Sequence, residues 1–337
     1  MITIKDIANA AGVSTATVSY VLNNTRYVSP DKKDRVLKAV SDLNYVPNAV
    51  ARGLRVQKSK AISLIVSDIT NPFYPDLAKA CEDVAQSRGY TINIVNTNDE
   101  AKLMAEAVSQ IREGRIDGLI ITCALEPDRP VIDSLSKEGY PIVLAHRKLE
   151  KLDVDTVISD HFSGGLEAAR HLIRLGHERI AFMTGVKGST VSLAAKQGYL
   201  EAMEEARLPV LEEWNIPGEA KYQESYEAAK QLISLPKSKR PTAVLNIGDV
   251  GSLGVMDAAF DLNLRVPEDL AIIGFDDLFF SSTRNIQLST VRIPRYELGR
   301  RATEILINRI QNKGSEEKQD ITLPVELIIR RTCGAKS

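Results

Sequence analysis

From residue 61 onward, short apolar runs alternate with longer segments of helical periodicity. The apolar runs have the length of strands and cover residues 61–66, 91–95, 118–122, 141–145, 157–159, 179–183, 243–246 and 270–274. Helical patterns between them include residues 76–87, 101–113 and 166–175. Continuous apolar strands separated by helices indicate parallel sheets with helices on both faces. Residues 60–337 are too many for one such sheet, so we predict an α/β fold with two doubly wound subdomains.

Ligands of doubly wound sheets bind outside the carboxyl ends of the strands and in the cleft between lobes. No glycine-rich GxGxxG or GxxxxGK(S/T) sequence follows any of the predicted strands. We therefore expect no dinucleotide or nucleotide cofactor.

The net charge of −1 conceals two regions of opposite sign. Residues 1–60 contain ten Lys and Arg side chains against four Asp, a charge of +6, and the remaining residues contain 33 against 40, a charge of −7. Clustered Lys and Arg bind phosphates with release of counterions, so the basic N-terminal region suggests contact with nucleic acid.

Three short helices are predicted in this basic region. Residues 4–11 have apolar positions at helical spacing, and Gly12 stands where that helix would end. Ser14 can cap a second helix that ends near Asn23, with Val18, Val21 and Leu22 on one face. A tight turn between two such helices is typical of the helix-turn-helix, whose second helix enters the major groove of DNA.

The third helix is signalled by Ser29-Pro30-Asp31, a capping residue, a proline at the first helical position and an acid in the first turn. Val36, Leu37, Val40 and Leu43 then follow at spacings expected for a core. Residues 1–46 are therefore predicted to form a small three-helix domain.

The stretch IKDIANAAGVSTATVSYVLN, residues 4–23, resembles the N-terminal signature of the lactose-repressor (LacI/GalR) family of transcription regulators. The family's pattern stands here as Asp6 to Ala8, Ala11 to Ser14, Thr17 to Ser19 and Asn23. The resemblance implies a DNA-binding regulator, and it continues through residues 45–55, which resemble the family's hinge segment.

In the hinge, Pro47 bars continuation of the third helix, and Asn48 can cap one or two further turns. So short a segment is not stably helical alone in water. The resemblance implies that residues 47–59 order when two copies meet on the duplex, with Leu54 as an apolar wedge in the minor groove and Ala51 and Arg55 also at the DNA.

Further family landmarks follow in order along the body, among them residues 71–74, 117–120, 176–182, 198–199, 240–243, 264–269 and 273–277. They imply a core that resembles a periplasmic sugar-binding protein, in residues 60–337. Each lobe is then discontinuous, about 60–160 with 292–322 and about 161–291 with 323–333.

The family's effector site lies between the lobes, and matching positions near strand ends give the candidate effector-binding residues. An aromatic side chain there can stack on a sugar or base, and a carboxylate can accept hydrogen bonds, which favours a neutral, hydroxyl-bearing or cationic ligand. For each acid, capping of the next helix is an equal alternative. The candidates are Phe73, Tyr74, Arg147, Asp160, Ser189, Asp249 and Asp276.

The chain departs from the family in one respect. Many sugar- and purine-responsive members carry an arginine three residues before the Gly-aromatic pair, whereas that position here is Ala195, before Gly198-Tyr199. Three explanations stay open: an unusual ligand, recognition by other residues, or control by a phosphocarrier protein partner, as in one branch of the family.

The leading hypothesis is a sequence-specific repressor that acts as a homodimer on a near-palindromic operator, with a small-molecule effector, a sugar or related metabolite. Thr15, Ala16 and Tyr20 would face bases. Thr17, Asn23, Arg26 and Lys33 would position the helices on phosphates, and Ser14, at the start of the second helix, is also a candidate DNA contact. Effector binding would change operator affinity through closure of the lobes.

Two other classes of function fit the sequence less well. A transported-solute binding protein would carry a secretion signal, and the N-terminus MITIKDIANA lacks one, so a cytoplasmic location is expected. An enzyme is disfavoured because the four histidines lack HExxH spacing and no GxSxG sequence is present. No membrane helix or metal site is expected, and Cys81, Cys123 and Cys333 are expected to be reduced packing residues.

Overall fold

The computed structural model describes residues 2–45, 59–313 and 317–335, and the chain divides into two compact units, Met1–Ser59 and Lys60–Ser337. The N-terminal unit contains α1 (Ile4–Ala11), α2 (Thr15–Asn23) and α3 (Pro30–Asp42). Its core is formed by Ile7, Ala8, Ala11, Val18, Val36 and Ala39. Leu37 is 46% exposed, contrary to expectation, because the buried stripe of α3 runs through Val36 and Ala39 instead.

Local hydrogen bonds set the ends of these helices. Asp6 accepts hydrogen bonds from the backbone N–H and the hydroxyl of Thr3, at 2.8 and 2.7 Å, at the start of α1. Gly12 ends α1 in the left-handed conformation, with φ 63°, which glycine adopts without a steric penalty. Ser14 caps α2 by accepting a hydrogen bond from the backbone N–H of Thr17 at 3.1 Å. The helix-turn-helix geometry thus follows from these few residues.

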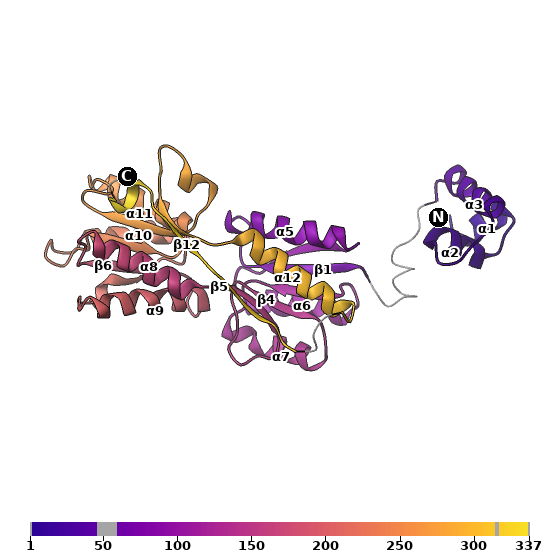
Figure 1. Cartoon of the computed structure of the whole chain (residues 1–337), viewed down its shortest axis with the longest axis horizontal. Helices are drawn as coiled ribbons and strands as arrows, with labels where there is room; N and C mark the ends of the chain where they lie inside the picture. The colour runs from indigo at the N-terminus through magenta and orange to yellow at the C-terminus, as the bar shows by residue number, and fades with distance from the viewer. Residues whose placement is uncertain (1, 46–58, 314–316, 336–337) are drawn as a thin grey trace. The chain divides into compact units, whose positions relative to one another are not determined.

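The first lobe of the second unit is a parallel sheet with the strand order β11-β5-β4-β3-β1-β2. Its strands are β1 (Ala61–Val66), β2 (Thr91–Asn96), β3 (Gly118–Ile121), β4 (Ile142–Ala145), β5 (Asp155–Ser159) and β11 (Asp320–Leu323). Helices α5 (Phe73–Ser87) and α12 (Arg295–Ile310) cover one face, and α6 (Ala101–Arg112) and α7 (Arg129–Lys137) cover the other (Figure 1).

The second lobe has the corresponding order β12-β10-β9-β8-β6-β7, with only β12 antiparallel to its neighbour. Its strands are β6 (Ile180–Thr184), β7 (Asn215–Pro217), β8 (Ala243–Asn246), β9 (Ala271–Asp276), β10 (Ser289–Arg292) and β12 (Glu326–Ile328). Helices α8 (His161–Arg174) and α9 (Thr190–Glu205) cover one face, and α10 (Tyr222–Ile233) and α11 (Asp249–Asp261) cover the other.

The chain passes between the lobes three times, from β5 to α8, from β10 to α12, and from β11 to β12. Figure 1 shows the last passage as the extended C-terminal segment. In each sheet the strand order reverses at the first strand, since β1 lies between β2 and β3, and β6 lies between β7 and β8. The predicted fold class, two doubly wound sheets after a helix-turn-helix domain, is confirmed.

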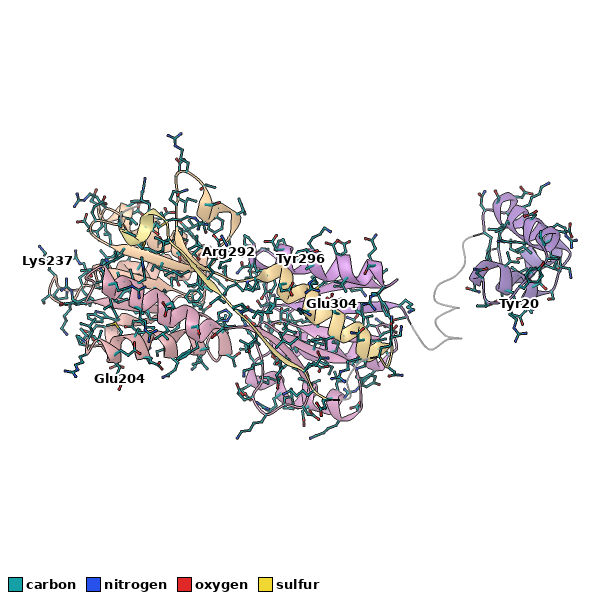
Figure 2. All side chains as sticks on the ribbon, in the orientation of Figure 1. Tyr20, Glu204, Lys237, Arg292, Tyr296 and Glu304 are labelled. Carbon is teal, nitrogen blue, oxygen red and sulfur yellow. The ribbon has the colours of Figure 1, made fainter. Side chains whose placement is uncertain are left out.

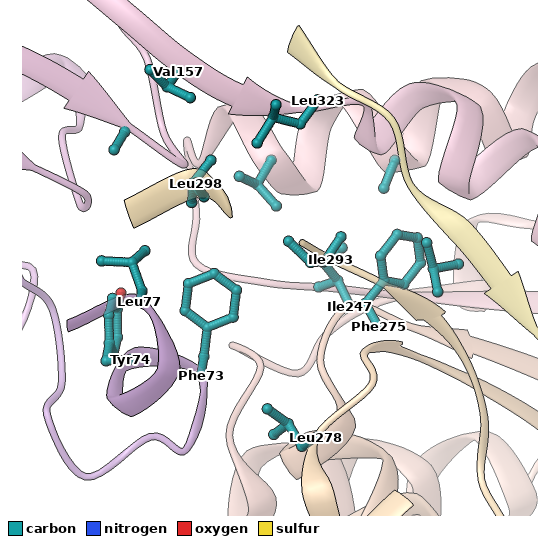
Figure 3. Packing of buried hydrophobic residues seen from close by; sticks show 14 of the residues in the cluster. Phe73, Tyr74, Leu77, Val157, Ile247, Phe275, Leu278, Ile293, Leu298 and Leu323 are labelled. Carbon is teal, nitrogen blue, oxygen red and sulfur yellow. The ribbon is translucent and has the colours of Figure 1, made fainter. Parts of the chain in front are cut away.

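One apolar cluster continues from the first lobe into the second. Figure 3 shows Phe73 of α5 on one side and Ile247, Phe275 and Leu278 of the second lobe on the other, with Ile293 near the chain passage. Because this packing joins both lobes, the strand ends of the two sheets are brought to a common space. None of the helices in the described ranges is long and apolar enough to cross a membrane.

Candidate DNA-binding helix and effector cavity

Helix α2 presents a polar surface opposite its buried face. Val18 is fully buried, while Thr15 and Ala16 are exposed and Tyr20 is partly exposed. Figure 2 shows the Tyr20 side chain extending away from the helical domain. The guanidinium of Arg26 lies over the Tyr20 ring, 5.3 Å from its centroid, so the two side chains form a single surface feature.

The other predicted DNA-contacting residues occupy different settings. The hydroxyls of Ser14 and Thr17 are hydrogen bonded to each other at 2.9 Å, and the amide of Asn23 donates to the carbonyl of Ser19 at 2.8 Å. Both pairs therefore contribute to the ends of α2. Lys33 is exposed on α3. Ala51, Leu54 and Arg55 lie outside the described residues.

A cavity of about 100 Å³ lies between the two lobes. Its lining comes from the carboxyl ends of strands in both sheets, where doubly wound folds bind ligands. The lining residues are Ser67, Asp68, Asn71, Phe73, Tyr74, Asp99, His146, Arg147, His161, Gly185, Val186, Ser189, Val191, Ser192, Glu219, Ala220, Lys221, Ile247, Gly248 and Asp276.

Five of the seven predicted effector-binding residues line this cavity: Phe73, Tyr74, Arg147, Ser189 and Asp276. Phe73 and Tyr74 open α5 and meet edge to face, with ring centroids 5.3 Å apart. The Tyr74 hydroxyl is hydrogen bonded to that of Ser67 at 2.7 Å, and burial raises the pKa of Tyr74. The aromatic wall of the cavity is thus fixed in place before any ligand binds.

Arg147 is buried, and its charge is already neutralised within its own lobe. Its Nη1 atom pairs with Asp99 and also donates to the carbonyl of Cys123 at 3.3 Å. Its Nε–H is buried without a hydrogen-bond partner among the described residues. A buried donor without a partner costs about 1–3 kcal/mol, so a ligand acceptor at this atom would gain affinity.

Two histidines that the sequence analysis did not assign to the site also line the cavity. The His146 ring is tilted by 40° against Phe73 with ring centroids 4.5 Å apart, and His161 meets His146 edge to face at 5.6 Å and stacks on Phe275 at 6.2 Å. This aromatic row runs from the first lobe to the second. His146 and His161 each follow a predicted strand closely, which is the signal that would have found them.

Both histidines are uncharged at neutral pH. Burial lowers the pKa of His161 to about 4 and the pKa of His146 well below its usual range. His161 Nδ1 lies 2.9 Å from the carbonyl of Ser159, which fixes Nδ1 as the protonated nitrogen. His146 Nδ1 has no hydrogen-bond partner among the described residues, so it is a second atom available to a ligand.

Asp276 ends β9 and supplies one of the carboxyl groups that line the cavity. Burial and the nearby charge of Asp249 raise its pKa well above the ordinary value, although the guanidinium of Arg295 opposes this. Arg147 and Lys221, the basic side chains among the described lining residues, are both paired, Arg147 with Asp99 and Lys221 with Glu219 at 3.1 Å. The cavity therefore has no unpaired cation among its described lining residues.

Asp160 and Asp249 do not line the cavity, and the structure gives them other roles. Asp160 caps α8 by accepting hydrogen bonds from the backbone N–H and the hydroxyl of Ser163, at 3.0 and 2.6 Å. Its carboxylate is thereby occupied, as the capping alternative predicted.

Asp249 is fully buried and accepts three hydrogen bonds, from the backbone N–H of Leu278 at 2.8 Å and from the hydroxyls of Ser281 and Thr290 at 2.6 Å each. Burial raises its pKa to about 6 against the effect of these donors. Asp249 thus fixes the segment after β9, next to Asp276, without reaching the ligand space.

Ala195 faces helix α8 rather than the cavity. A Cβ atom at Gly165 would lie 2.0 Å from the Ala195 carbonyl oxygen, which shows how closely α8 and α9 approach there. The part of α9 that lines the cavity is its first turn, with Ser189, Val191 and Ser192. The arginine that many family members carry is absent at position 195.

No cluster of three or more potential metal-ligating side chains occurs in residues 2–45, 59–313 and 317–335. Cys81, Cys123 and Cys333 are buried free thiols, as predicted. Burial raises the pKa of Cys81 and Cys123 to about 12, which makes them unreactive packing residues.

Comparison with known proteins agrees with this arrangement. The family model of bacterial regulatory proteins of the lacI family matches residues 3–48, and that of periplasmic binding proteins and the sugar binding domain of the LacI family matches residues 59–331. The HTH-type transcriptional repressors PurR of Photorhabdus laumondii and Proteus mirabilis are 36% and 37% identical, over 98% of this chain and 97% of each relative.

Solved structures are similar over the same extent. The lac repressor dimer bound to operator and the anti-inducer ONPF has a TM-score of 0.88 at 26% identity, covering 99% of both chains. The complex of the transcriptional regulator CelR with cellobiose has a TM-score of 0.74 at 26% identity, covering 98% of this chain and 100% of the other.

A helix-turn-helix domain followed by a two-lobed core with a ligand cavity defines a DNA-binding repressor with a ligand-binding domain. The chain belongs to the LacI family of bacterial regulatory proteins.

Proposed function

We propose that this chain represses transcription as a homodimer on a near-palindromic operator, and that an uncharged small molecule bound between the lobes modulates operator affinity. Two copies of α2 would read half-sites related by two-fold symmetry. Residues 47–59 serve as the hinge in this proposal. The similar lac repressor was solved as a dimer bound to operator, which supports the proposed assembly.

The cavity carries the effector part of the proposal. Arg147 Nε and His146 Nδ1 are buried and without partners among the described residues, and both belong to residues that line the same space. The charges of Arg147 and Lys221 are balanced by Asp99 and Glu219, which disfavours an anionic effector. A compact neutral ring that both donates and accepts hydrogen bonds, such as a sugar or a related metabolite, fits these groups best.

The similar proteins support the same chemistry without identifying the molecule. The similar regulator CelR was solved as a complex with cellobiose, whereas the two relatives compared above are PurR repressors. The row of Phe73, His146 and His161 offers ring faces on which a sugar or a heterocycle can pack.

Selection of operator DNA from a random pool tests the first part of the proposal. At moderate salt, the purified chain should enrich an inverted repeat, and sedimentation at micromolar concentration should show a dimer. The selected DNA then serves to screen neutral, anionic and cationic metabolites for release or tightening of the complex. Enrichment of no inverted repeat would overturn the DNA part, and a response only to anions would overturn the effector part.

A further inference from the structure

One guanidinium joins the end of strand β9, in the second lobe, to helix α5 of the first lobe. Arg295 is the first residue of α12, directly after the second chain passage, and its side chain is 11% exposed. Its Nη2 and Nε atoms donate to the carboxylate of Asp76 on α5, at 2.7 and 3.2 Å. Its Nη1 atom donates to the main-chain oxygens of Asp276 and, at 3.4 Å, Asp277.

The backbone that Arg295 holds is in an unfavourable conformation. Asp276 has φ 109° and Asp277 has φ 55°, both in the region that residues with a Cβ atom rarely adopt. Such conformations are unfavourable and persist where neighbouring contacts enforce them. The Asp276 side chain lines the effector cavity, so its direction depends on this backbone.

The contacts around Asp276 are divided among several residues. The carboxylate of Asp277 is held by Arg292 at 2.8 Å and Arg330 at 2.6 Å, and the backbone N–H of Leu278 is held by Asp249 at 2.8 Å. These residues fix the segment on the C-terminal side of Asp276. The carbonyl of Asp276 itself is held by Arg295, which reaches it from the helix that packs on the first lobe.

We propose that Arg295 is a positioning residue for the effector site. It holds Asp276 in the conformation that turns the carboxyl group into the cavity, and because Arg295 belongs to α12 it joins this conformation to the first lobe. This inference rests on the proposed effector site. It adds a specific connection between the effector site and the first lobe, because a ligand that displaces Asp276 would also displace Arg295 and with it the start of α12.

An ordinary surface ion pair is the simpler role for Arg295. The Asp76 side chain is 60% exposed, and exposed ion pairs contribute little to stability. A surface ion pair with Asp76 and the positioning of the Asp276 backbone predict different effects when Arg295 or Asp76 is replaced. If Arg295 positions Asp276, removing Arg295 should release both the backbone at residues 276–278 and a contact between the lobes, whereas removing Asp76, which lies in the same lobe as α12, should leave the hydrogen bond from Arg295 to the Asp276 carbonyl in place.

The test uses the full chain without any effector and three variants, Arg295→Met, Asp76→Asn and the control Arg301→Met. Arg301 lies on the same helix, and its ion-pair partners, Glu297 at 2.9 Å and Glu304 at 4.0 Å, belong to α12 itself. Spin labels at Lys102→Cys and Glu204→Cys, one exposed site on each lobe, report the distance between lobes. The three native thiols are buried.

Hydrogen exchange of the peptide that spans residues 274–280 reports the backbone at Asp276. We expect Arg295→Met to broaden the distance between lobes and to speed this exchange by about tenfold or more. Asp76→Asn should leave the distance between lobes unchanged and the exchange within about twofold of the parent chain, and Arg301→Met should change neither. Equal exchange rates in Arg295→Met and Asp76→Asn, or no change in Arg295→Met, would overturn the positioning role.

A third readout links the contact to regulation. Arg295→Met should shift the affinity for selected operator DNA by about fivefold or more, and Arg301→Met should leave it within about twofold. Unchanged affinity in Arg295→Met would overturn the coupling of this contact to DNA binding. If no operator is enriched at all, the proposed function fails, while the distance and exchange measurements still decide the role of Arg295.

Discussion

Gly198 of α9 faces Phe162 of α8 so closely that a Cβ atom at position 198 would lie 2.1 Å from the Phe162 carbonyl oxygen. The same pair of helices makes a second close approach, between Gly165 and Ala195. Two glycines on facing helices therefore set the distance between α8 and α9. This distance in turn places the first turn of α9, with Ser189 and Ser192, at the cavity.

Gly198→Ala should lower the free energy of unfolding by about 1–3 kcal/mol, because the added methyl group collides with backbone that cannot turn aside. Thermal unfolding of the full chain measures the effect. Gln197→Ala is a matched control, since that side chain is exposed on the same helix and its replacement should be nearly neutral. Equal melting temperatures for both variants would contradict the close approach.

Tyr20→Ala should change which operator sequence is preferred, because Tyr20 lies on the partly exposed face of α2, where the Arg26 guanidinium packs over its ring. Lys33→Ala should weaken binding to all DNA by a similar factor and reduce the slope of affinity against salt by about one. Selection of operators for each variant, with affinities at several salt concentrations, distinguishes the two. Identical effects would refute the assignment of base and phosphate contacts.

Asp276→Asn should abolish or strongly reduce the response of the operator complex to its effector, since this carboxyl group lines the cavity. Asp160→Ala should leave that response intact and cost about 1 kcal/mol of stability through loss of the α8 cap. Operator release measured with an active molecule from the metabolite screen compares the two variants. Loss of response in Asp160→Ala at full stability would reverse the roles assigned to these two acids.

Acid should destabilise the chain partly through His161, whose pKa is lowered from 6.5 to about 4 by burial. As pH falls below 6.5, the unfolded chain binds a proton at this residue and the folded chain does not, so the free energy of unfolding decreases. The loss grows until about pH 4 and amounts to about 3 kcal/mol.

His161→Asn should remove this part of the acid sensitivity while keeping a donor near the Ser159 carbonyl. Urea unfolding at pH 7 and pH 4.5 gives the difference for the parent chain and the variant. Asp249, with its pKa raised to about 6, acts in the opposite direction in both proteins and cancels in the comparison. If the difference between the unfolding free energies at pH 7 and pH 4.5 is the same in both proteins, the pKa of His161 in the folded chain is close to its ordinary value, which would contradict this prediction.

The sequence located the central strands well because buried parallel strands are continuous apolar runs. The run at residues 61–66 coincides with β1, and those at 118–122 and 270–274 overlap β3 and β9. The short strands β7, β10, β11 and β12, of three or four residues each, were not predicted, since so few residues show no period. These short strands form because each pairs with a neighbouring strand of the sheet, which the local sequence does not show.

The candidate site residues could be predicted where a place after the carboxyl end of a strand is enough to bring a side chain to the cavity. Phe73 and Arg147 line the cavity because they follow strands whose carboxyl ends meet there. Position could not decide among the acids. Whether Asp249 faces a ligand depends on donors from Ser281 and Thr290, more than thirty residues away in the chain. His146 and His161 were considered only as members of an enzyme motif, HExxH, and so were missed as ring surfaces.

The three passages between β5 and α8, β10 and α12, and β11 and β12 limit how such a protein can be rebuilt. No single cut in the gene separates one lobe from the other, because each is assembled from segments that the other interrupts. A chimera that combines the first lobe of one relative with the second lobe of another needs three junctions, one at each passage. Recombination at one point should instead yield hybrids in which at least one lobe is a mosaic of the two parents.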